Sequence, residues 1–297
     1  MKAFDNYNPI TIFIYFASVI TIGMFCLNPV TMNPLILFLS LSGALTTYII
    51  RNRMSGVKTH FFFFGMFILL AVINPLFNHN GVTVLLIINN NPITLEALLY
   101  GTASAAAIIS VIYWFRSFSQ IMTSDKLLYI LGNISPKFAL ILSMTLRYVP
   151  LFENQTQKVI QAQRGLGLYS DTDFMSRVRG GTRVFSVMVT WALENGVVTS
   201  DSMTARGYGI TKRTFFSIFK FRKKDIAVTA ASLILFAIIL TGVISGAINF
   251  RFYPEISHAQ TTAVSVITYI AYGLLTFLPA AIETEEEIKW KYLKSKI

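Results

Sequence analysis

Two short motifs in this sequence place an arginine and a glycine where a helix is expected to end. They are Gln163-Arg164-Gly165 and Ala205-Arg206-Gly207, and in each a large apolar residue and a second glycine follow. Glycine accepts the left-handed turn that ends many helices, and an arginine there lies at the negative end of the helix dipole. Its guanidinium can pair in a bidentate way with a carboxylate of a partner. One such motif would be only a helix stop, but two matched copies indicate a pair of docking tips.

The sequence offers no set of residues for catalysis or metal binding. No glycine is followed by lysine, so there is no Gly-x-x-x-x-Gly-Lys phosphate loop with which this chain could bind ATP. The histidines, His60, His79 and His258, are scattered and form no metal-binding pattern. We therefore expect no catalytic residue, no metal site and no cofactor in this chain.

Composition assigns the chain to the membrane. Of its 297 residues, 54% are hydrophobic and only 13% are charged, whereas soluble domains carry about 25% charged residues. The mean hydropathy is +0.59. The net charge of +11 comes from basic clusters between apolar runs, a distribution that is typical of membrane topology and not of nucleic-acid binding.

The chain contains several apolar runs that are suited to crossing a bilayer. Such a crossing takes about 20 residues. The runs lie at residues 10–29, 34–50, 61–77, 93–115, 226–248 and 263–282. Residues 103–107 are small, which would let a neighbouring helix come close. Basic residues cluster before the third and fifth runs and after the sixth, so both termini and residues 116–225 are predicted to be cytoplasmic.

Residues 116–225 contain no clean span, but apolar and charged residues alternate there at helical spacing. Ser135 and Pro136 are typical of the N-cap and first position of a helix, which should run to the first Arg-Gly motif. Phe185, Met188 and Trp191 fall on one face of a second helix that should reach the second motif.

The predicted fold class is an all-α polytopic membrane protein of about six transmembrane helices. A cytoplasmic set of amphipathic coupling helices separates spans four and five. The predicted parts are residues 1–115 with four spans, 116–225 with the coupling helices, and 226–297 with two spans and a cytoplasmic tail.

Residues 115–167 and 192–209 resemble the T component of energy-coupling factor (ECF) transporters, the family that also includes the membrane subunit of cobalt-type uptake systems. The most specific parts are Leu146-Arg147-Tyr148-Val149-Pro150 and the two Arg-Gly motifs. The resemblance implies that the motifs end two long coupling helices, and that Arg164 and Arg206 each dock into one of two ABC-type ATPases. Those ATPases, and not this chain, would bind ATP and magnesium.

The same resemblance implies a separate substrate-binding membrane subunit, the S subunit, and uptake of a vitamin or metal ion across a prokaryotic cell membrane. Contacts with the S subunit are predicted at apolar residues of the coupling helices, namely Leu142, Leu146, Phe185, Met188 and Trp191. The family's His-Pro-rich N-terminal signature is replaced here by Asn6-Tyr7-Asn8-Pro9. The sequence therefore leaves the cargo open.

Two other functions stay open at this point. A stand-alone secondary transporter would usually carry ionisable or helix-breaking residues at mid-membrane depth in two related halves. A membrane enzyme acting on lipid would need a cluster of acidic residues or histidines at the membrane interface. Neither pattern is found in the sequence.

Overall fold

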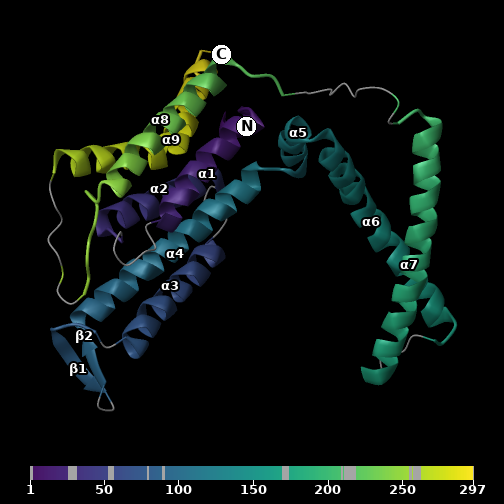
Figure 1. The fold of residues 1–297 in the computed structure, drawn as a ribbon, viewed down its shortest axis with the longest axis horizontal. Helices are drawn as coiled ribbons and strands as arrows, with labels where there is room; N and C mark the ends of the chain where they lie inside the picture. Colours follow the sequence, from purple (N-terminus) through teal and green to yellow (C-terminus); the bar gives the residue numbers. More distant parts are fainter. Residues whose placement is uncertain are drawn as a thin grey trace. The chain divides into compact units, whose positions relative to one another are not determined.

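The computed structural model describes residues 3–25, 32–52, 57–78, 80–88, 91–168, 174–208, 210, 219–253, 256 and 262–296. The chain forms two compact units (Figure 1). Unit 1 comprises Met1–Thr123 with Phe219–Ile297, and unit 2 comprises Ser124–Ile218. Unit 1 contains the helices of membrane-spanning composition, and unit 2 contains the helices that carry the Arg-Gly motifs.

The elements follow one another as a long helical series with one hairpin. Unit 1 contains a 3-10 turn (Ala3–Asn6), α1 (Pro9–Phe25), α2 (Pro34–Asn52), α3 (Val57–Phe77), β1 (Val84–Ile88), β2 (Asn91–Thr94), α4 (Leu95–Ile121), α8 (Lys223–Ile244) and α9 (Ala263–Lys294). Unit 2 contains α5 (Ser124–Ile134), α6 (Pro136–Gly165) and α7 (Phe174–Ala205).

The apolar helices of unit 1 confirm the predicted all-α, multi-pass membrane fold. Within the described ranges, α3, α4, α8 and α9 are long and apolar enough to cross a membrane. The apolar parts of α1 and α2, Pro9–Phe25 and Pro34–Ile50, are shorter, and each would extend about 25 Å. These six helices coincide with the six predicted spans to within a few residues at most ends, although α9 continues well past residue 282.

Helix α4 is central to the packing of unit 1 because it contacts α1, α2 and α3, while α9 contacts α2 and α8. Trp114 of α4 is fully buried, and its Nε1 donates a hydrogen bond to Ser40 Oγ at 3.3 Å. Gly101 lets α4 approach α3 closely, since a Cβ there would lie 2.6 Å from the Ala71 carbonyl oxygen. Small residues thus bring the backbones together, as is common between helices in membranes.

Helices α1 and α2 begin in the same way, with an asparagine followed by a proline. The Oδ1 atoms of Asn8 and Asn33 each accept the backbone N–H two residues ahead, at 3.0 Å. Asn33 also donates through Nδ2 to the Ile248 carbonyl at 3.2 Å and to the Tyr269 hydroxyl at 2.7 Å. The cap of α2 is therefore also a link to the C-terminal helices.

Asp225 connects the start of α1 to the start of α8. Its side chain is buried, Oδ1 accepts the Asn8 backbone N–H at 2.9 Å, and Oδ2 accepts the Arg222 backbone N–H at 2.8 Å. The Asn8 and Asp225 positions are 217 residues apart in the sequence. This carboxylate therefore fixes the position of α8, the first helix after unit 2.

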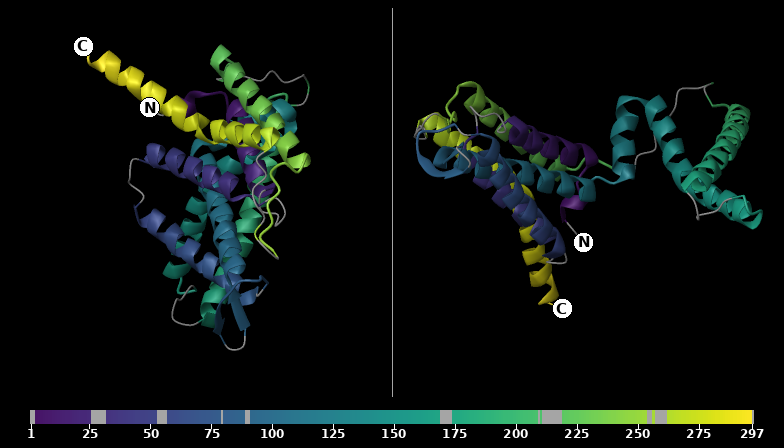
Figure 2. Two further views of the ribbon diagram at one scale, coloured as in Figure 1. Left: turned by 90° about the vertical axis from the view of Figure 1, so that its left-hand side faces the viewer. Right: turned by 90° about the horizontal axis from the view of Figure 1, so that it is seen from below.

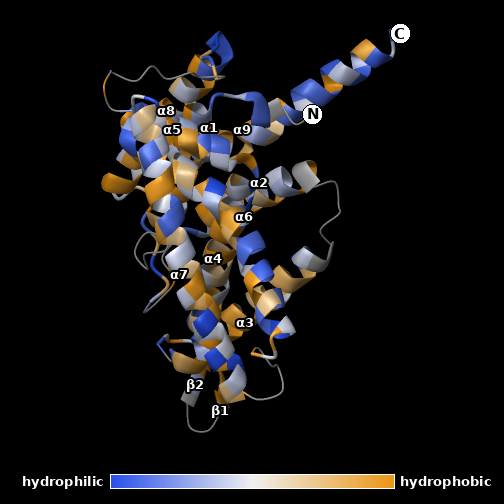
Figure 3. Cartoon of the chain, turned by 90° about the vertical axis from the view of Figure 1, so that its right-hand side faces the viewer, coloured by the Kyte–Doolittle hydropathy of each residue, from blue (hydrophilic) through white to orange (hydrophobic). Residues whose placement is uncertain are grey.

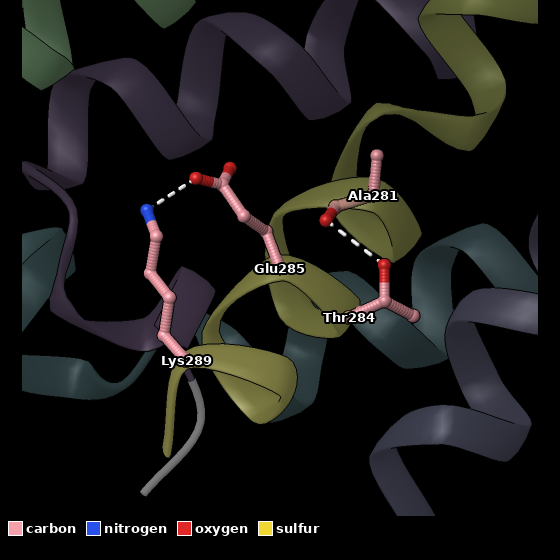
Figure 4. Close-up of polar contacts among 4 residues, drawn as sticks. All are labelled: Ala281, Thr284, Glu285 and Lys289. Carbon is pink, nitrogen blue, oxygen red and sulfur yellow. Dashed lines mark hydrogen bonds and ion pairs between the residues drawn. The ribbon is translucent and has the colours of Figure 1, made fainter. Parts of the chain in front are cut away.

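Helix α9 has 32 residues and a length of about 48 Å, which exceeds the roughly 30 Å hydrocarbon core of a bilayer. Its last turns extend beyond the other helices of unit 1 (Figure 2). There Lys289 pairs with Glu285, and Thr284 Oγ1 donates to the Ala281 carbonyl at 3.0 Å (Figure 4). The charged tail that follows the sixth span is thus a continuation of the same helix.

The segment before α4 differs from the expected loop. Residues Val84–Ile88 and Asn91–Thr94 pair as a two-stranded antiparallel hairpin, and α4 begins at Leu95. The hairpin lies at the end of unit 1 where α3 ends and α4 begins (Figure 1). Hydropathy shows the apolar spans but did not predict these strands.

The Asp225 carboxylate should contribute measurably to stability. Asp225→Asn places an amide next to two backbone donors, and an unsatisfied buried group of this kind costs about 1–3 kcal/mol. We expect a lower midpoint of thermal unfolding in detergent solution for this variant. Asp201→Asn, at an exposed position of α7, is the control and should leave the midpoint unchanged; equal midpoints for the two variants would contradict the assignment.

Candidate functional site: the tips of two long helices

Helices α6 and α7 are the framework of unit 2 and have 30 and 32 residues. Helix α6 begins as predicted, with Ser135 as an extended N-cap residue and Pro136 in the first turn. It continues past Pro150 without interruption. In each case the helix runs as one piece to an Arg-Gly motif, so the backbone fixes where each arginine lies.

The two helices cross at a small cluster of aromatic side chains. The Phe152 ring of α6 packs edge-on against Trp191 of α7, with 5.3 Å between ring centroids. One turn away along α6 and about two turns away along α7, the hydroxyls of Tyr148 and Thr199 are 2.7 Å apart. Because Tyr148 precedes Phe152 while Thr199 follows Trp191, α6 and α7 run antiparallel at the crossing.

The antiparallel crossing sends the two tips in opposite directions. From Phe152 to Arg164 the helix extends about 18 Å, and from Trp191 to Arg206 it extends about 22 Å. Figure 1 shows the C-terminal ends of α6 and α7 on opposite sides of the crossing. The two arginines therefore cannot share one small site.

The α6 tip ends in a Schellman motif. The Leu168 N–H donates to the Gln163 carbonyl at 2.9 Å, and the Gly167 N–H donates to the Arg164 carbonyl at 3.0 Å. Gly167 has a φ of 69°, the left-handed conformation that only glycine adopts at low cost. Gly165 lies inside the helix.

The α7 tip uses the same motif in another register. The Tyr208 N–H donates to the Met203 carbonyl at 3.1 Å and the Gly207 N–H to the Thr204 carbonyl at 3.0 Å. Here Gly207, with a φ of 73°, directly follows Arg206. The expectation that glycine directly after arginine ends each helix is thus right for Gly207 and wrong for Gly165. In α6, the second glycine of the motif, Gly167, takes that role.

Both arginines are exposed, but their neighbours differ. Gln163 is largely buried beside Arg164, whereas Ala205 is exposed beside Arg206. Arg183 of α7 donates through Nη1 to the Leu168 carbonyl at 3.4 Å, so the α6 tip has a second guanidinium at its end. The two tips are therefore not equivalent in charge.

A groove of about 520 Å³ lies between α6 and α7. Its lining is largely apolar and comprises Phe152, Thr156, Gly181, Val184, Phe185, Met188, Val189, Ala192 and Leu193. Of the predicted S-subunit contacts, Met188 forms the floor with 7% of its surface exposed, and Phe185 stands at the rim with 70% exposed.

The remaining predicted contacts lie outside this groove. Trp191 is half-buried against Phe152. Leu142 and Leu146 lie in the first half of α6, and Leu146 is 37% exposed. The structure brings Phe185 and Met188 to one surface and leaves the two leucines separate from it.

Tyr148, Phe152 and Thr199 join the two helices, and none of them was among the predicted site residues. Tyr148 and Phe152 are four positions apart, a spacing that places both on one face of a helix. That spacing was the available signal, but it does not show which partner helix the face meets.

The described residues offer no candidate metal centre. In the described part of the chain, no group of three or more His, Cys, Asp or Glu residues is arranged to hold a metal ion. His60 lies in unit 1, where its Nδ1 is 2.9 Å from the Tyr113 hydroxyl. His79 and His258 lie outside the described residues.

Comparison with known proteins gives matches along most of the chain. The sequence model of a family described as CbiQ, cobalt transport protein, matches residues 6–216. The chain is 28% identical over 106 residues to the energy-coupling factor transporter transmembrane protein EcfT of Lactobacillus helveticus, covering 35% of this chain and 38% of that protein. It is 28% identical over 125 residues to the uncharacterized protein MG181 homolog of Mycoplasma pneumoniae, covering 41% of this chain and 28% of that protein. The chain thus matches well under half the length of either relative.

The difference in register between the two tips can be tested with alanine. Gly167→Ala forces a left-handed alanine at a cost of about 1–2 kcal/mol, whereas Gly165→Ala should strengthen the helix by up to about 1 kcal/mol. We expect faster amide hydrogen exchange at residues 166–168 in Gly167→Ala and unchanged or slower exchange in Gly165→Ala. Loss of protection in Gly165→Ala alone would mean that both motifs end their helices in the same register.

Proposed function

This chain belongs to the cobalt transport protein (CbiQ) family, and from that premise we propose that it is the energy-coupling transmembrane subunit of an ECF-type ABC importer. The family and the apolar helices establish a multi-pass membrane component of a transport system. The observation that carries the more specific proposal is the pair of exposed arginines on capped helix ends that leave one crossing in opposite directions.

Each tip would dock into one ATPase subunit. Arg164 and Arg206 are too far apart for one socket, since each is about 20 Å from the crossing along its own helix. A guanidinium on a glycine-capped helix end is a compact donor for a carboxylate at the base of a groove. Two such donors on one rigid pair of helices are suited to a pair of ATPases, which would bind the ATP and magnesium.

The tips are expected to bind unequal sockets. Arg183 adds positive charge at the α6 tip, where its guanidinium contacts the Leu168 carbonyl. At the α7 tip the nearest preceding acid in the helix is Asp201, which reduces the local positive charge. The two sockets are therefore expected to differ in the side chains that surround the carboxylate.

Motion of the ATPases would reach the membrane through the same helices. Closure of the ATPase pair would draw the two docking points together and shift the apolar surface near Phe185 and Met188. That surface, with Trp191, Leu142 and Leu146, would contact a separate S subunit that binds a vitamin or a metal ion. In this arrangement both termini and unit 2 lie in the cytoplasm of a prokaryote.

Charge reversal at both tips tests the docking. In Arg164→Glu with Arg206→Glu, each tip would present a carboxylate to an acidic socket, and an unpaired buried charge costs about 3–5 kcal/mol. We expect both ATPases to be lost during affinity purification of this subunit, and uptake by cells to be abolished. The single variants should each retain a weakened complex.

Lys158→Glu is the matched control, because Lys158 is an exposed basic residue of α6 away from the tip. It should retain both ATPases and uptake. Recovery of both ATPases with the double variant at the wild-type yield would defeat the proposal. Transport by this chain reconstituted without other subunits would instead identify a self-sufficient carrier.

A further inference from the structure

The hairpin of unit 1 is a short ribbon with its own pairing. Leu86 lies opposite Ile93 and Ile87 opposite Pro92, and a bulge interrupts the pairing between Val84 and Leu86. Because successive residues of a strand point to opposite faces, Leu86 and Ile87 mark the two faces of the ribbon.

Both faces of this ribbon are apolar and exposed. Leu86 is 63% exposed and Ile87 is 70% exposed, and Val84 and Leu85 are each 52% exposed. Residues 78–94 contain no aspartate, glutamate, lysine or arginine. A water-exposed hairpin normally has one polar face, so an apolar environment must cover both sides.

The base of the ribbon is fixed to α4. The Thr83 hydroxyl donates to Glu96 Oε1 at 2.7 Å, and the Thr83 backbone N–H donates to the same oxygen at 3.2 Å. The Thr94 hydroxyl donates to the Asn80 carbonyl at 2.8 Å. Gly81 fits here because a Cβ would lie 2.5 Å from Glu96 Oε2. The ribbon therefore keeps a fixed position at the start of α4.

The apolar surface of the ribbon continues that of α3. The last turn of α3 exposes Leu76 and Phe77, at 51% and 79%, and β2 contacts α3 as well as α4. Little of the apolar window of α3, 17%, is buried within the chain, and hydrophobic colour covers much of this helix (Figure 3). In a multi-pass membrane protein that surface faces lipid.

We propose that the β1–β2 hairpin is a lipid anchor that inserts into the boundary between headgroups and acyl chains where α3 ends and α4 begins. A protein partner would cover one face of the ribbon and leave the other in water, whereas a lipid leaflet surrounds both. The outer edges of a two-stranded ribbon keep unpaired N–H and C=O groups, which are not tolerated in the hydrocarbon core. The hairpin therefore lies at the boundary and does not span, and it fixes the depth of α4. This inference does not depend on ATPase docking.

Site-directed spin labelling in phospholipid vesicles tests the anchor on the full chain with its co-purifying subunits. In a Cys26→Ser background, Leu86→Cys and Ile87→Cys carry a nitroxide on opposite faces. Leu69→Cys on α3, where Leu69 is 56% exposed, is the lipid reference, and Lys158→Cys is the water reference. We expect both hairpin labels to be more accessible to oxygen than to a water-soluble nickel chelate, with a shallower depth than the label at Leu69→Cys.

Three results would overturn the anchor. Nickel accessibility at both hairpin positions equal to that of Lys158→Cys would place the ribbon in water. A lipid-like label on one face with an immobile label, inaccessible to both reagents, on the other would indicate a protein partner. Labels inaccessible to both reagents on both faces would mean that protein encloses the hairpin.

Discussion

The structure depends on one constraint, which is that the backbone N–H and C=O groups at helix ends need hydrogen-bond partners. A helix leaves its first N–H and last C=O groups without partners, and in lipid each unsatisfied group costs several kcal/mol. Four of the described spans meet this demand with side chains at their starts, whereas no side-chain hydrogen bond caps the start of α9 at Thr262. Asn8 and Asn33 cap α1 and α2, Thr94 caps α4 by accepting the Ala97 N–H at 3.3 Å, and Asp225 accepts a backbone N–H from the start of α8.

In unit 2 the same demand determines where the arginines lie. The Schellman bonds after α6 and α7 close on the left-handed glycines Gly167 and Gly207, each two residues beyond the end of its helix. The bond pattern places Arg164 within the last helical turn and Arg206 at the cap itself. Helix termination, and not the arginine side chain, therefore sets where each guanidinium extends from its helix.

The spans could be predicted from hydropathy because each is one long apolar run, such as the residues that follow Phe61. The hairpin could not, since a short apolar run such as Val84–Ile88 is compatible with a strand or with the end of a helix. It was also ambiguous which glycine would adopt the left-handed conformation, because in both motifs one glycine follows the arginine directly and another follows it by three positions. In α7, Met203 gives Tyr208 an apolar partner in the observed register. In α6 either register pairs a glutamine with a leucine, so the apolar contact does not distinguish them. Asp225 was missed because its partner, Asn8, is 217 positions away.

If the two tips transmit force, that force has to pass through the joint between α6 and α7. The joint between α6 and α7 consists of the Phe152–Trp191 ring contact and the hydrogen bond between Tyr148 and Thr199. Aromatic contacts of this kind contribute mainly through buried area and edge geometry, so they tolerate a small change of crossing angle better than a bidentate charge pair does. Because each arm is about 20 Å long, a rotation of a few degrees at this joint displaces an arginine by an ångström or more. The groove beside the joint, where Met188 forms the floor, would change shape in the same movement. Under the proposed function, this joint with charged ends would therefore let the ends stay bound while the crossing angle adjusts.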